Sequence, residues 1–379
     1  MKRAAICILA FIMLFLCACS ASEKDSVKEP EQIITPVLDE LAHNQWYLFS
    51  EYDEEIKLFE QPEVKDGFTP INTTHIESKV DIGIWDYLSR THDYAEKDII
   101  VALIDSSVDI YHEDLSANIW TNSGEIPDDG IDNDQNGYID DINGWNFITN
   151  NNEINANVDE FSHGTHCAGI ISALHNGIGT MGIAGSAPVK LMALPAVEKG
   201  DDSEEIENVI SAIHYAEKMG AKICSLSCSF DEYSSELETA MSESEMLFVV
   251  SAGNFQSGFI GGLDLEKYPR YPACFVSENI ITVSNLTHEG KLAPSSNYGA
   301  NTVDIAAPGE LIYSTLPGNN YGFQSGTSMA VPIVSAVLAL CALDTGENIT
   351  EAAQLLLKNA SDCTALEGKV TGNRVVWFK

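Results

Sequence analysis

The segment at residues 324–332 (QSGTSMAVP) constrains this chain more than any other. It presents Ser328 among small residues, and a long apolar run follows at residues 333–343. This pattern predicts a sharp turn into a buried helix. Ser328 would lie at the helix N-terminus, where its oxygen is exposed and its backbone N–H is not used by the helix. Such a serine is chemically useful only beside a base, so we expect a histidine and a carboxylate elsewhere in the chain.

A carboxylate and a histidine occupy suitable places. Residues 99–104 (IIVALI) form a continuous apolar run, which is typical of a strand buried on both faces of a parallel sheet, and Asp105 follows directly. Asp105 is therefore expected at the C-terminal end of a strand, where open α/β sheets bind their ligands. His163 opens a helix that we predict at residues 163–174.

Strand and helix patterns alternate along the rest of the chain. Further strands are predicted at residues 190–194, 223–227, 246–251 and 280–284. Helices are predicted at residues 81–89, 234–242 and 352–358, and a further amphipathic helix is expected to be capped by Ser203 and closed by Gly220. The alternation predicts an α/β fold with a parallel sheet and right-handed crossovers.

The N-terminus has the pattern of an export signal. A basic pair, Lys2-Arg3, precedes an apolar stretch at residues 4–16 that is too short to span a bilayer. The following Leu16-Cys17-Ala18-Cys19 resembles the signal of bacterial lipoproteins, which implies a lipid on Cys19 and anchoring to the outside of the cell membrane. The alternative is an ordinary cleaved signal and a secreted protein. We predict a signal peptide at residues 1–18, a tether at 19–42 and one catalytic domain at 43–379.

The charge of the chain limits its partners. It has 20 basic and 57 acidic residues, a formal net charge of −37. This balance argues against nucleic acid, because phosphate binding needs clustered Lys and Arg. A highly soluble surface or bound cations fit better. Export permits disulfides, but the pairing is open, and we expect mostly buried thiols among the cysteines after Cys19. These are Cys167, Cys224, Cys228, Cys274, Cys341 and Cys363.

The order of the reactive residues is Asp105, His163, Ser328, and each lies in a recognisable frame: VALIDS, HGTHCAG and GTSMAVP. Residues 249–254 (VVSAGN) form another frame, which places Asn254 after a strand. With these motifs the chain resembles the subtilisin (subtilase) family of serine proteases, in which this chain order occurs. The resemblance implies a three-layer α/β fold with a mainly parallel central sheet flanked by helices.

The resemblance also implies a mechanism. Ser328 would attack a peptide carbonyl, His163 would accept its proton, and Asp105 would orient the imidazole. The oxyanion hole would consist of the Ser328 backbone N–H and the Asn254 side-chain amide. Ser106 matches a residue that hydrogen-bonds the aspartate. His166 matches a structural histidine of the family.

Substrate binding follows from the same likeness. Residues 223–229 match an edge strand that would pair with an extended peptide or protein substrate. Two segments would form the walls of the pocket for the residue before the scissile bond. They are Ser227, Cys228 and Ser229 on one side and Ser251, Ala252 and Gly253 on the other. We expect the enzyme to be a monomer.

One or two calcium sites are predicted. The acidic loop at residues 121–146 resembles the start of an EF-hand loop, with Asp132, Asp134, Asn136 and Asp140 as candidate ligands and a solvated acidic turn as the alternative. A second site is implied only by the resemblance. Its ligands would be Asp114, Leu174, Asn176, Ile178 and Thr180, with Gln45 as a further candidate.

One departure from the family concerns folding. No inhibitory prodomain is recognised before Gln45, where the likeness to the catalytic domain begins, so folding is hypothesised to depend on calcium instead. Two rival functions remain open. One is a peptide-binding pseudoprotease without activity. The other is an esterase, which the order of the triad and the absence of a G-x-S-x-G motif oppose.

Overall fold

The computed structural model describes residues 38–48, 81–90, 92, 94, 98–155, 163–198, 202–255, 257, 261–346 and 348–378. The predicted signal peptide, Cys19 and most of the predicted tether lie outside the described residues.

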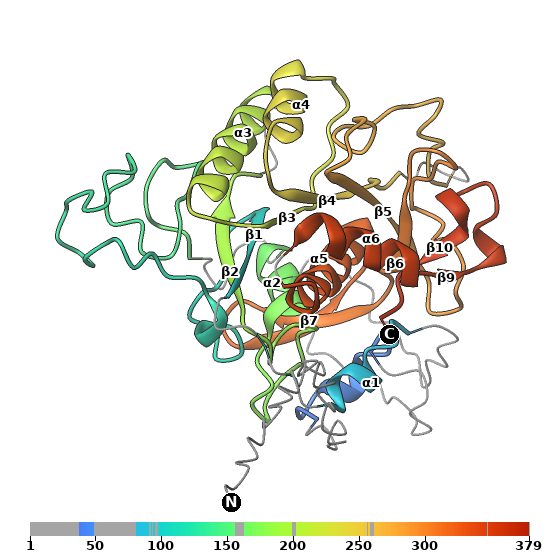
Figure 1. Ribbon diagram of the computed structural model, residues 1–379, viewed down its shortest axis with the longest axis horizontal. Coiled ribbons are helices and arrows are strands. Elements are labelled where there is room, and N and C mark those ends of the chain that lie inside the picture. Colours follow the sequence, from blue (N-terminus) through green and yellow to red (C-terminus); the bar gives the residue numbers. More distant parts are fainter. Residues whose placement is uncertain are drawn as a thin grey trace, which may run out of the picture.

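A single large sheet forms the centre of the molecule (Figure 1). Its strands lie in the order β2-β1-β3-β4-β5-β6-β10-β9, and all neighbouring pairs are parallel except β9 with β10. The bounds are β1 Ile99–Asp105, β2 Val189–Pro195, β3 Ile223–Leu226, β4 Leu247–Ser251, β5 Ile280–Leu286, β6 Ile305–Pro308, β9 Ser361–Asp362 and β10 Arg374–Val375. This sheet confirms the predicted α/β class.

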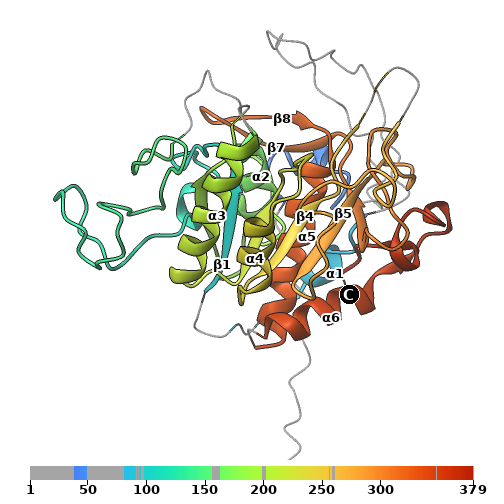
Figure 2. The same cartoon turned by 90° about the horizontal axis from the view of Figure 1, so that it is seen from above.

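Helices cover both faces of the sheet and make three layers. Helices α3 (Asp202–Lys218) and α4 (Ser235–Ser242) lie on one face, and α2 (His163–Ser172), α5 (Thr327–Asp344) and α6 (Ile349–Asn359) lie on the other (Figures 1 and 2). Alternate residues of β1 enter different cores, because successive strand side chains point to opposite faces. Val101 and Leu103 pack in the core with α5, whereas Ala102 and Ile104 pack in the core with α3.

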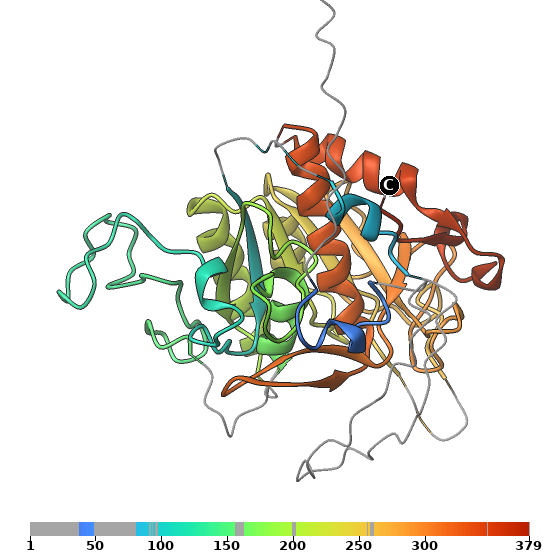
Figure 3. The same ribbon diagram turned by 90° about the horizontal axis from the view of Figure 1, so that it is seen from below.

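The smaller elements lie around these layers. Helix α1 (Trp85–Leu88) lies beside α5 and α6 in the view from below (Figure 3). Single 3-10 turns are η1 Ala42–Asn44, η2 Ser116–Asn118, η3 Thr364–Leu366 and η4 Thr371–Asn373. The backbone N–H of Phe378 bonds to the carbonyl of Ile82, so the last described residues join the first segments at this face.

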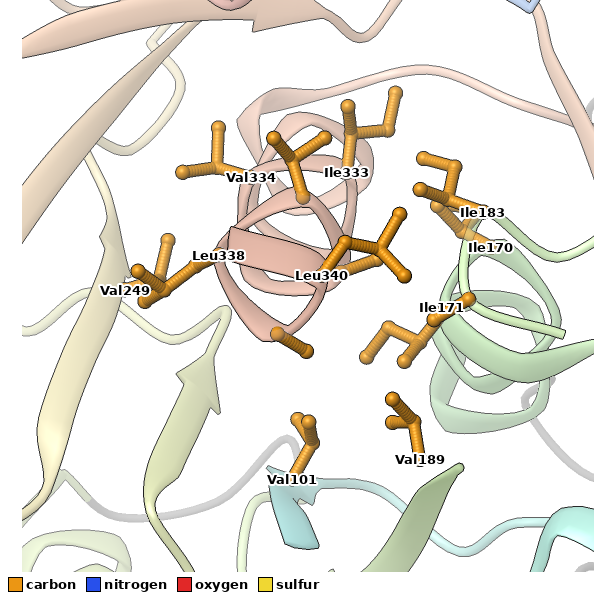
Figure 4. Packing of buried hydrophobic residues seen from close by; sticks show 14 of the residues in the cluster. Val101, Ile170, Ile171, Ile183, Val189, Val249, Ile333, Val334, Leu338 and Leu340 are labelled. Carbon is orange, nitrogen blue, oxygen red and sulfur yellow. The ribbon is translucent and has the colours of Figure 1, made fainter. Parts of the chain in front are cut away.

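Helix α5 is the central element of the larger core. Its side chains lie between the sheet and α2, with Val334 and Leu338 toward Val249 and Leu340 toward Ile171 (Figure 4). Burying each of these aliphatic side chains contributes about 1.5–3 kcal/mol, so the helix that follows Ser328 is held firmly. Among the described helices, α5 alone is long and apolar enough to cross a membrane, but 89% of it is buried inside the protein. We therefore assign it to the core.

The sequence did not predict the antiparallel hairpin of β7 (Ile312–Leu316) and β8 (Asn320–Gln324), which leads into α5. The hairpin is fastened to α2 by hydrogen bonds from the Ser314 and Thr315 hydroxyls to main-chain carbonyls of α2. His166 is buried and its Nε2 lies 3.0 Å from the carbonyl oxygen of Ile312 and 3.1 Å from that of Gly322. These contacts place His166 in the structural role that the family resemblance implies.

Three local predictions were wrong. Ser203 lies inside α3, which begins at Asp202, so it is not the helix cap. Strand β3 lies between β1 and β4 rather than at an edge, because both of its sides are used for main-chain pairing. It also ends at Leu226, one residue before the predicted end at residue 227. All the described cysteines are free, and Cys167, Cys224, Cys228 and Cys341 are buried, as expected for structural thiols.

Candidate active site

The carboxyl end of β1 and the first turn of α2 meet at the edge of the sheet where the parallel strands end. Asp105 is buried, and its Oδ1 lies 2.6 Å from Nδ1 of His163. The backbone N–H of Ser106 donates to the same Oδ1 at 2.7 Å. The predicted bond from Ser106 to the aspartate is therefore a main-chain bond, while the Ser106 hydroxyl accepts the N–H of Gly164 at 2.9 Å.

Gly164 explains how the two segments come so close. A Cβ at this position would lie 2.4 Å from the carbonyl oxygen of Ser106 and 2.8 Å from that of Ser107. Only glycine allows this approach without displacing the β1 terminus. The HG pair of the sequence motif is thus what lets His163 reach Asp105.

Asp105 changes the acidity of His163. Burial alone lowers the pKa of His163, but the charge of the Asp105 carboxylate and its hydrogen bond more than offset this, so the pKa lies well above its usual value of 6.5. The imidazolium is therefore stabilised at the site. The contact at Nδ1 leaves Nε2 as the nitrogen able to exchange a proton with another group.

Ser328 lies in the first turn of α5, next to Ser227, which directly follows β3, and to Cys167 of α2. Its Oγ lies 3.4 Å from the carbonyl oxygen of Ser227. Its own carbonyl accepts hydrogen bonds from the Ser227 hydroxyl at 3.1 Å and the Cys167 thiol at 3.5 Å. Pro332 explains why this carbonyl is available, since a proline four residues further along the helix has no N–H to donate.

Cys167 connects the two halves of the site. Its Sγ lies 3.9 Å from Nδ1 of His163 as well as 3.5 Å from the carbonyl oxygen of Ser328. The thiol is fully buried, and burial raises its pKa, so it stays neutral. Its position brings α2 and α5 together and does not give it a nucleophilic role.

Asn254 is fixed against the N-terminus of α5. Its Oδ1 accepts the N–H of Thr327 at 3.1 Å, and its Nδ2 donates to the Thr327 hydroxyl at 2.8 Å. That hydroxyl also lies 2.7 Å from the hydroxyl of Ser251. A side-chain amide has two N–H donors, and Thr327 uses one of them. The positioning roles of Thr327 and Ser251 were not predicted, although both residues lie within the quoted motifs and Ser251 was expected as a pocket wall.

The predicted walls of the substrate pocket lie near each other. A Cβ at Gly253 would lie 2.9 Å from the Ser229 hydroxyl, which places residues 227–229 beside residues 251–253. Ser227 and Cys228 also line a cavity of about 1020 Å³ together with Asp105 and His163. Of the segment predicted to pair with substrate, residues 223–226 are already used, because β3 is paired on both sides, and residues 227–229 lie beyond its end.

The region around Asp114 fits a hard cation. Asp114 is buried and accepts the Thr180 N–H at 2.9 Å and the Asn176 amide at 3.3 Å. Asp39, which the sequence analysis missed, accepts the N–H of Gly177 through Oδ1, while its buried Oδ2 has no hydrogen-bond partner. Desolvation raises the pKa of Asp39 to about 6 and that of Asp114 to about 7, the latter also through the charge of Asp39.

Gln45 is not available for this site, contrary to one prediction. Its side-chain nitrogen Nε2 donates to the carbonyl of Met181 and the hydroxyl of Tyr47, and its Oε1 accepts the N–H of Met181. Asp39, rather than Gln45, is therefore the residue of the N-terminal segment that could offer an oxygen to a cation. Asp39 and Asp114 are thus two buried carboxylates whose negative charge is not balanced, and Oδ2 of Asp39 has no hydrogen-bond partner. Such a set of oxygens suits Ca²⁺.

The acidic loop at residues 121–146 differs from the predicted ligand set. Carboxylates of Glu125, Asp134 and Asp141 come together, whereas those of Asp132 and Asp140 accept main-chain N–H groups of their own loop. The predicted ligand Asn136 donates its side-chain amide to Asp141 at 2.8 Å and to Asp134 at 3.2 Å. Amide donors therefore already compensate much of this charge.

The parallel sheet, the contact between Asp105 and His163 and the position of Ser328 in the first turn of α5 fit a protein of the serine-protease class. The sequence model of the subtilase family matches residues 96–374. The chain therefore belongs to the subtilase family.

Named relatives cover different parts of the chain. Thermitase of Thermoactinomyces vulgaris is 31% identical over 285 residues, which cover 74% of this chain and 84% of thermitase. Subtilisin-like protease 1 of Plasmodium vivax is 36% identical over 256 residues, which cover 63% of this chain and only 40% of the relative. A crystal structure of a cold adapted subtilisin-like serine proteinase matches with a TM-score of 0.57 at 22% identity and covers 76% of this chain and 91% of its own. This last likeness shows the fold.

Proposed function

We propose that this protein is a serine endopeptidase that acts outside the cytoplasm and hydrolyses peptide bonds with Asp105, His163 and Ser328. The observation that supports it most is the 2.6 Å contact between His163 and the buried Asp105, together with Ser328 in the first turn of α5. A buried acid that holds an imidazole next to a helix-terminal serine serves proton transfer. Membership in the subtilase family supports the same reaction.

The reaction has two halves. Ser328 Oγ attacks the carbonyl carbon of the scissile bond while its proton moves to Nε2 of His163. The carbon–nitrogen bond then breaks, His163 gives the proton to the departing amine, and an ester to Ser328 remains. A water molecule hydrolyses this ester, with His163 again taking and returning a proton. Asp105 keeps its charge and stabilises the imidazolium in both halves.

The negative oxygen of each tetrahedral intermediate needs donors. The backbone N–H of Ser328 lies in the first turn of α5, where helix geometry leaves N–H groups unused. The second N–H of the Asn254 amide is the other donor. Thr327 and Ser251 hold this amide in place before substrate arrives, so no reorganisation is needed at the moment of reaction.

Fluorophosphonate labelling tests the proposal directly. The wild type should be labelled and should digest casein, and Ser328→Ala should do neither while keeping the wild-type circular dichroism spectrum and melting temperature. A folded wild type that resists labelling would favour the peptide-binding pseudoprotease. Labelling with ester turnover but without proteolysis would favour the esterase.

Calcium belongs to the proposal as a structural cation. Asp39 and Asp114 would hold it, together with oxygens of the loop at residues 174–180, and would fasten the N-terminal segment to that loop. The backbone bond from Leu41 to Gly179 already joins the same segments. The calcium prediction for residues 121–146 stays a prediction, with Glu125, Asp134 and Asp141 as the carboxylates that a cation would meet.

Location is the last part of the proposal. The signal at residues 1–18 would direct export, and a lipid on Cys19 would hold the enzyme at the outer surface of the cell membrane as a monomer. Mass spectrometry of the mature N-terminus tests this. A diacylated Cys19 supports anchoring, whereas an unmodified N-terminus cut elsewhere supports a secreted enzyme.

A further inference from the structure

An acidic cavity of about 1020 Å³ adjoins the catalytic residues. Asp105, His163 and Ser227 line one part of it. Four further carboxylates line the rest of the cavity. Glu153 lies between β1 and α2, Glu198 lies between β2 and α3, and Asp202 and Glu205 lie in the first turn of α3. Among the described residues that line it, none is Lys or Arg. A substrate bound at the triad must pass this negative region.

The cavity is distinct from the pocket between residues 227–229 and 251–253. Ser227 and Cys228 line it, but residues 251–253 are not among its described lining residues. It therefore lies on another side of the segment that would pair with the substrate. In an extended peptide, successive side chains point to opposite faces. When the residue before the scissile bond enters the first pocket, the second and fourth residues before that bond point the other way, toward the cavity.

The shape and charge of the cavity suit a long cationic side chain. Ile104, Ile148 and Val197 provide apolar surface for methylene groups, and the carboxylates provide acceptors for a charged end. The main-chain N–H of Glu198 donates to Oε1 of Glu205 at 3.1 Å, which holds that carboxylate at the turn between β2 and α3. Burial raises the pKa of the Cys228 thiol, and the negative charges of Asp105 and Glu205 raise it further. These carboxylates therefore make the electrostatic potential at this wall of the cavity negative.

We propose that this cavity selects substrates with Lys or Arg at the second or fourth residue before the scissile bond. The inference rests on the proposed peptidase function and adds the substrate class. Acidic residues in the first turn of α3 also stabilise a helix N-terminus, so a purely structural role for Asp202 and Glu205 is the competing explanation. The two explanations differ in what they predict for specificity.

Fluorogenic peptides measure the preference. Two series would carry Lys, Arg, norleucine or Glu at the second or at the fourth position before the scissile bond, with all other positions fixed. We expect kcat/KM to be at least about tenfold higher for Lys or Arg than for norleucine at one of these positions, and lowest for Glu. The preference should weaken as ionic strength rises, because part of the cavity is open to solvent.

Paired variants separate specificity from helix stability. Glu198→Gln with Glu205→Gln removes two charges from the cavity. Glu204→Gln with Glu207→Gln removes two exposed charges from α3, the helix that carries Glu205, and neither residue lines the cavity. Rates are normalised to the concentration of active sites titrated with fluorophosphonate, so a misfolded fraction does not change the measured rate constants. The first pair should reduce the Lys-to-norleucine ratio about tenfold, and the second pair should leave it unchanged.

Several outcomes would overturn the inference. Equal rates for Lys and norleucine peptides in an enzyme that labels fully would remove the cavity preference and leave the peptidase function intact. A lower melting temperature of the Glu198/Glu205 pair with an unchanged ratio would assign these residues to helix stability alone. Failure of both labelling and peptide cleavage would overturn the proposed function and this inference with it.

Discussion

Two of the regions that bury carboxylates in the described part of the chain compensate the charge in different ways. Asp105 lies 2.6 Å from His163, so its counter-charge is part of the protein and forms during the reaction. Among the described residues, Asp39 and Asp114 receive only neutral donors, namely main-chain N–H groups, the Asn176 amide and the Thr180 hydroxyl, and their pKa values rise to about 6 and about 7. The comparison indicates that the charge of Asp105 is balanced within the protein, whereas the charges of Asp39 and Asp114 are not, and this difference is the reason for proposing a cation beside them.

The largest expected effect is that of Asp105→Asn. The asparagine keeps the size of the side chain but removes the charge and favours the wrong imidazole tautomer, so kcat/KM should fall by about 10⁴. Because Asp105 raises the pKa of His163, and the base must be neutral, wild-type activity should increase as pH rises through that raised pKa. In Asp105→Asn the pKa of His163 should be lower, so the residual activity should reach its maximum at a lower pH than the wild-type activity.

Steady-state kinetics from pH 5 to 10 check this, with Asp39→Asn as the matched loss of a buried carboxylate. If Asp39→Asn lowered kcat as much as Asp105→Asn at saturating calcium, the two regions would not be separate.

The next largest effect is expected from Asn254→Ala. Removing one side-chain donor to the oxyanion should lower kcat by about 10²–10³ with little change in KM. Thr327→Ala should cost less, since it only releases the amide of Asn254 from its fixed orientation. Single-turnover kinetics with an ester and a peptide substrate measure both. A change confined to KM would assign Asn254 to ground-state binding instead.

Calcium removal should act on stability rather than on chemistry. At pH 8, an excess of chelator is expected to lower the melting temperature by about 5–10 °C, because saturating calcium stabilises only the folded state. Asp114→Asn should abolish this difference. In chelator the variant should be at least as stable as the wild type, since it no longer buries an uncompensated charge.

Calorimetry with and without calcium measures the response. A calcium-dependent melting temperature that survives in Asp114→Asn would place the stabilising cation elsewhere.

Acidity should tune the same response. The folded pKa of Asp114 is about 7 against a usual value of 3.8, so the folded protein without calcium binds more protons than the unfolded chain between these values. Its stability should therefore fall as pH rises across this interval. Calcium competes with the protons, so the stabilisation by calcium should grow from pH 5 to pH 8. Melting curves with and without calcium at each pH measure this. A calcium-induced rise of the melting temperature that stays constant from pH 5 to pH 8 would contradict the assignment of the cation to Asp114.

The sequence predicted the catalytic edge better than the metal regions, for a physical reason. Asp105 follows an apolar strand, and Ser328 precedes an apolar helix, so local patterns locate both. Asp39 meets Asp114 only through tertiary packing of the N-terminal segment, and no local pattern indicates it. The β7–β8 hairpin was missed because its strands mix Ser, Thr, Tyr and Asn with few aliphatic residues.

The smallest effect is expected in the acidic loop. Asp134→Asn removes one carboxylate of the Glu125–Asp134–Asp141 group, but the Asn122 and Asn136 amides already donate to Asp134, so little uncompensated charge is lost. We expect the calcium response of the melting temperature to change by less than about 2 °C, against its complete loss in Asp114→Asn. A response in Asp134→Asn as large as in Asp114→Asn would show that amide donors do not replace a cation here. The distinction between compensated and uncompensated acidic regions would then fail.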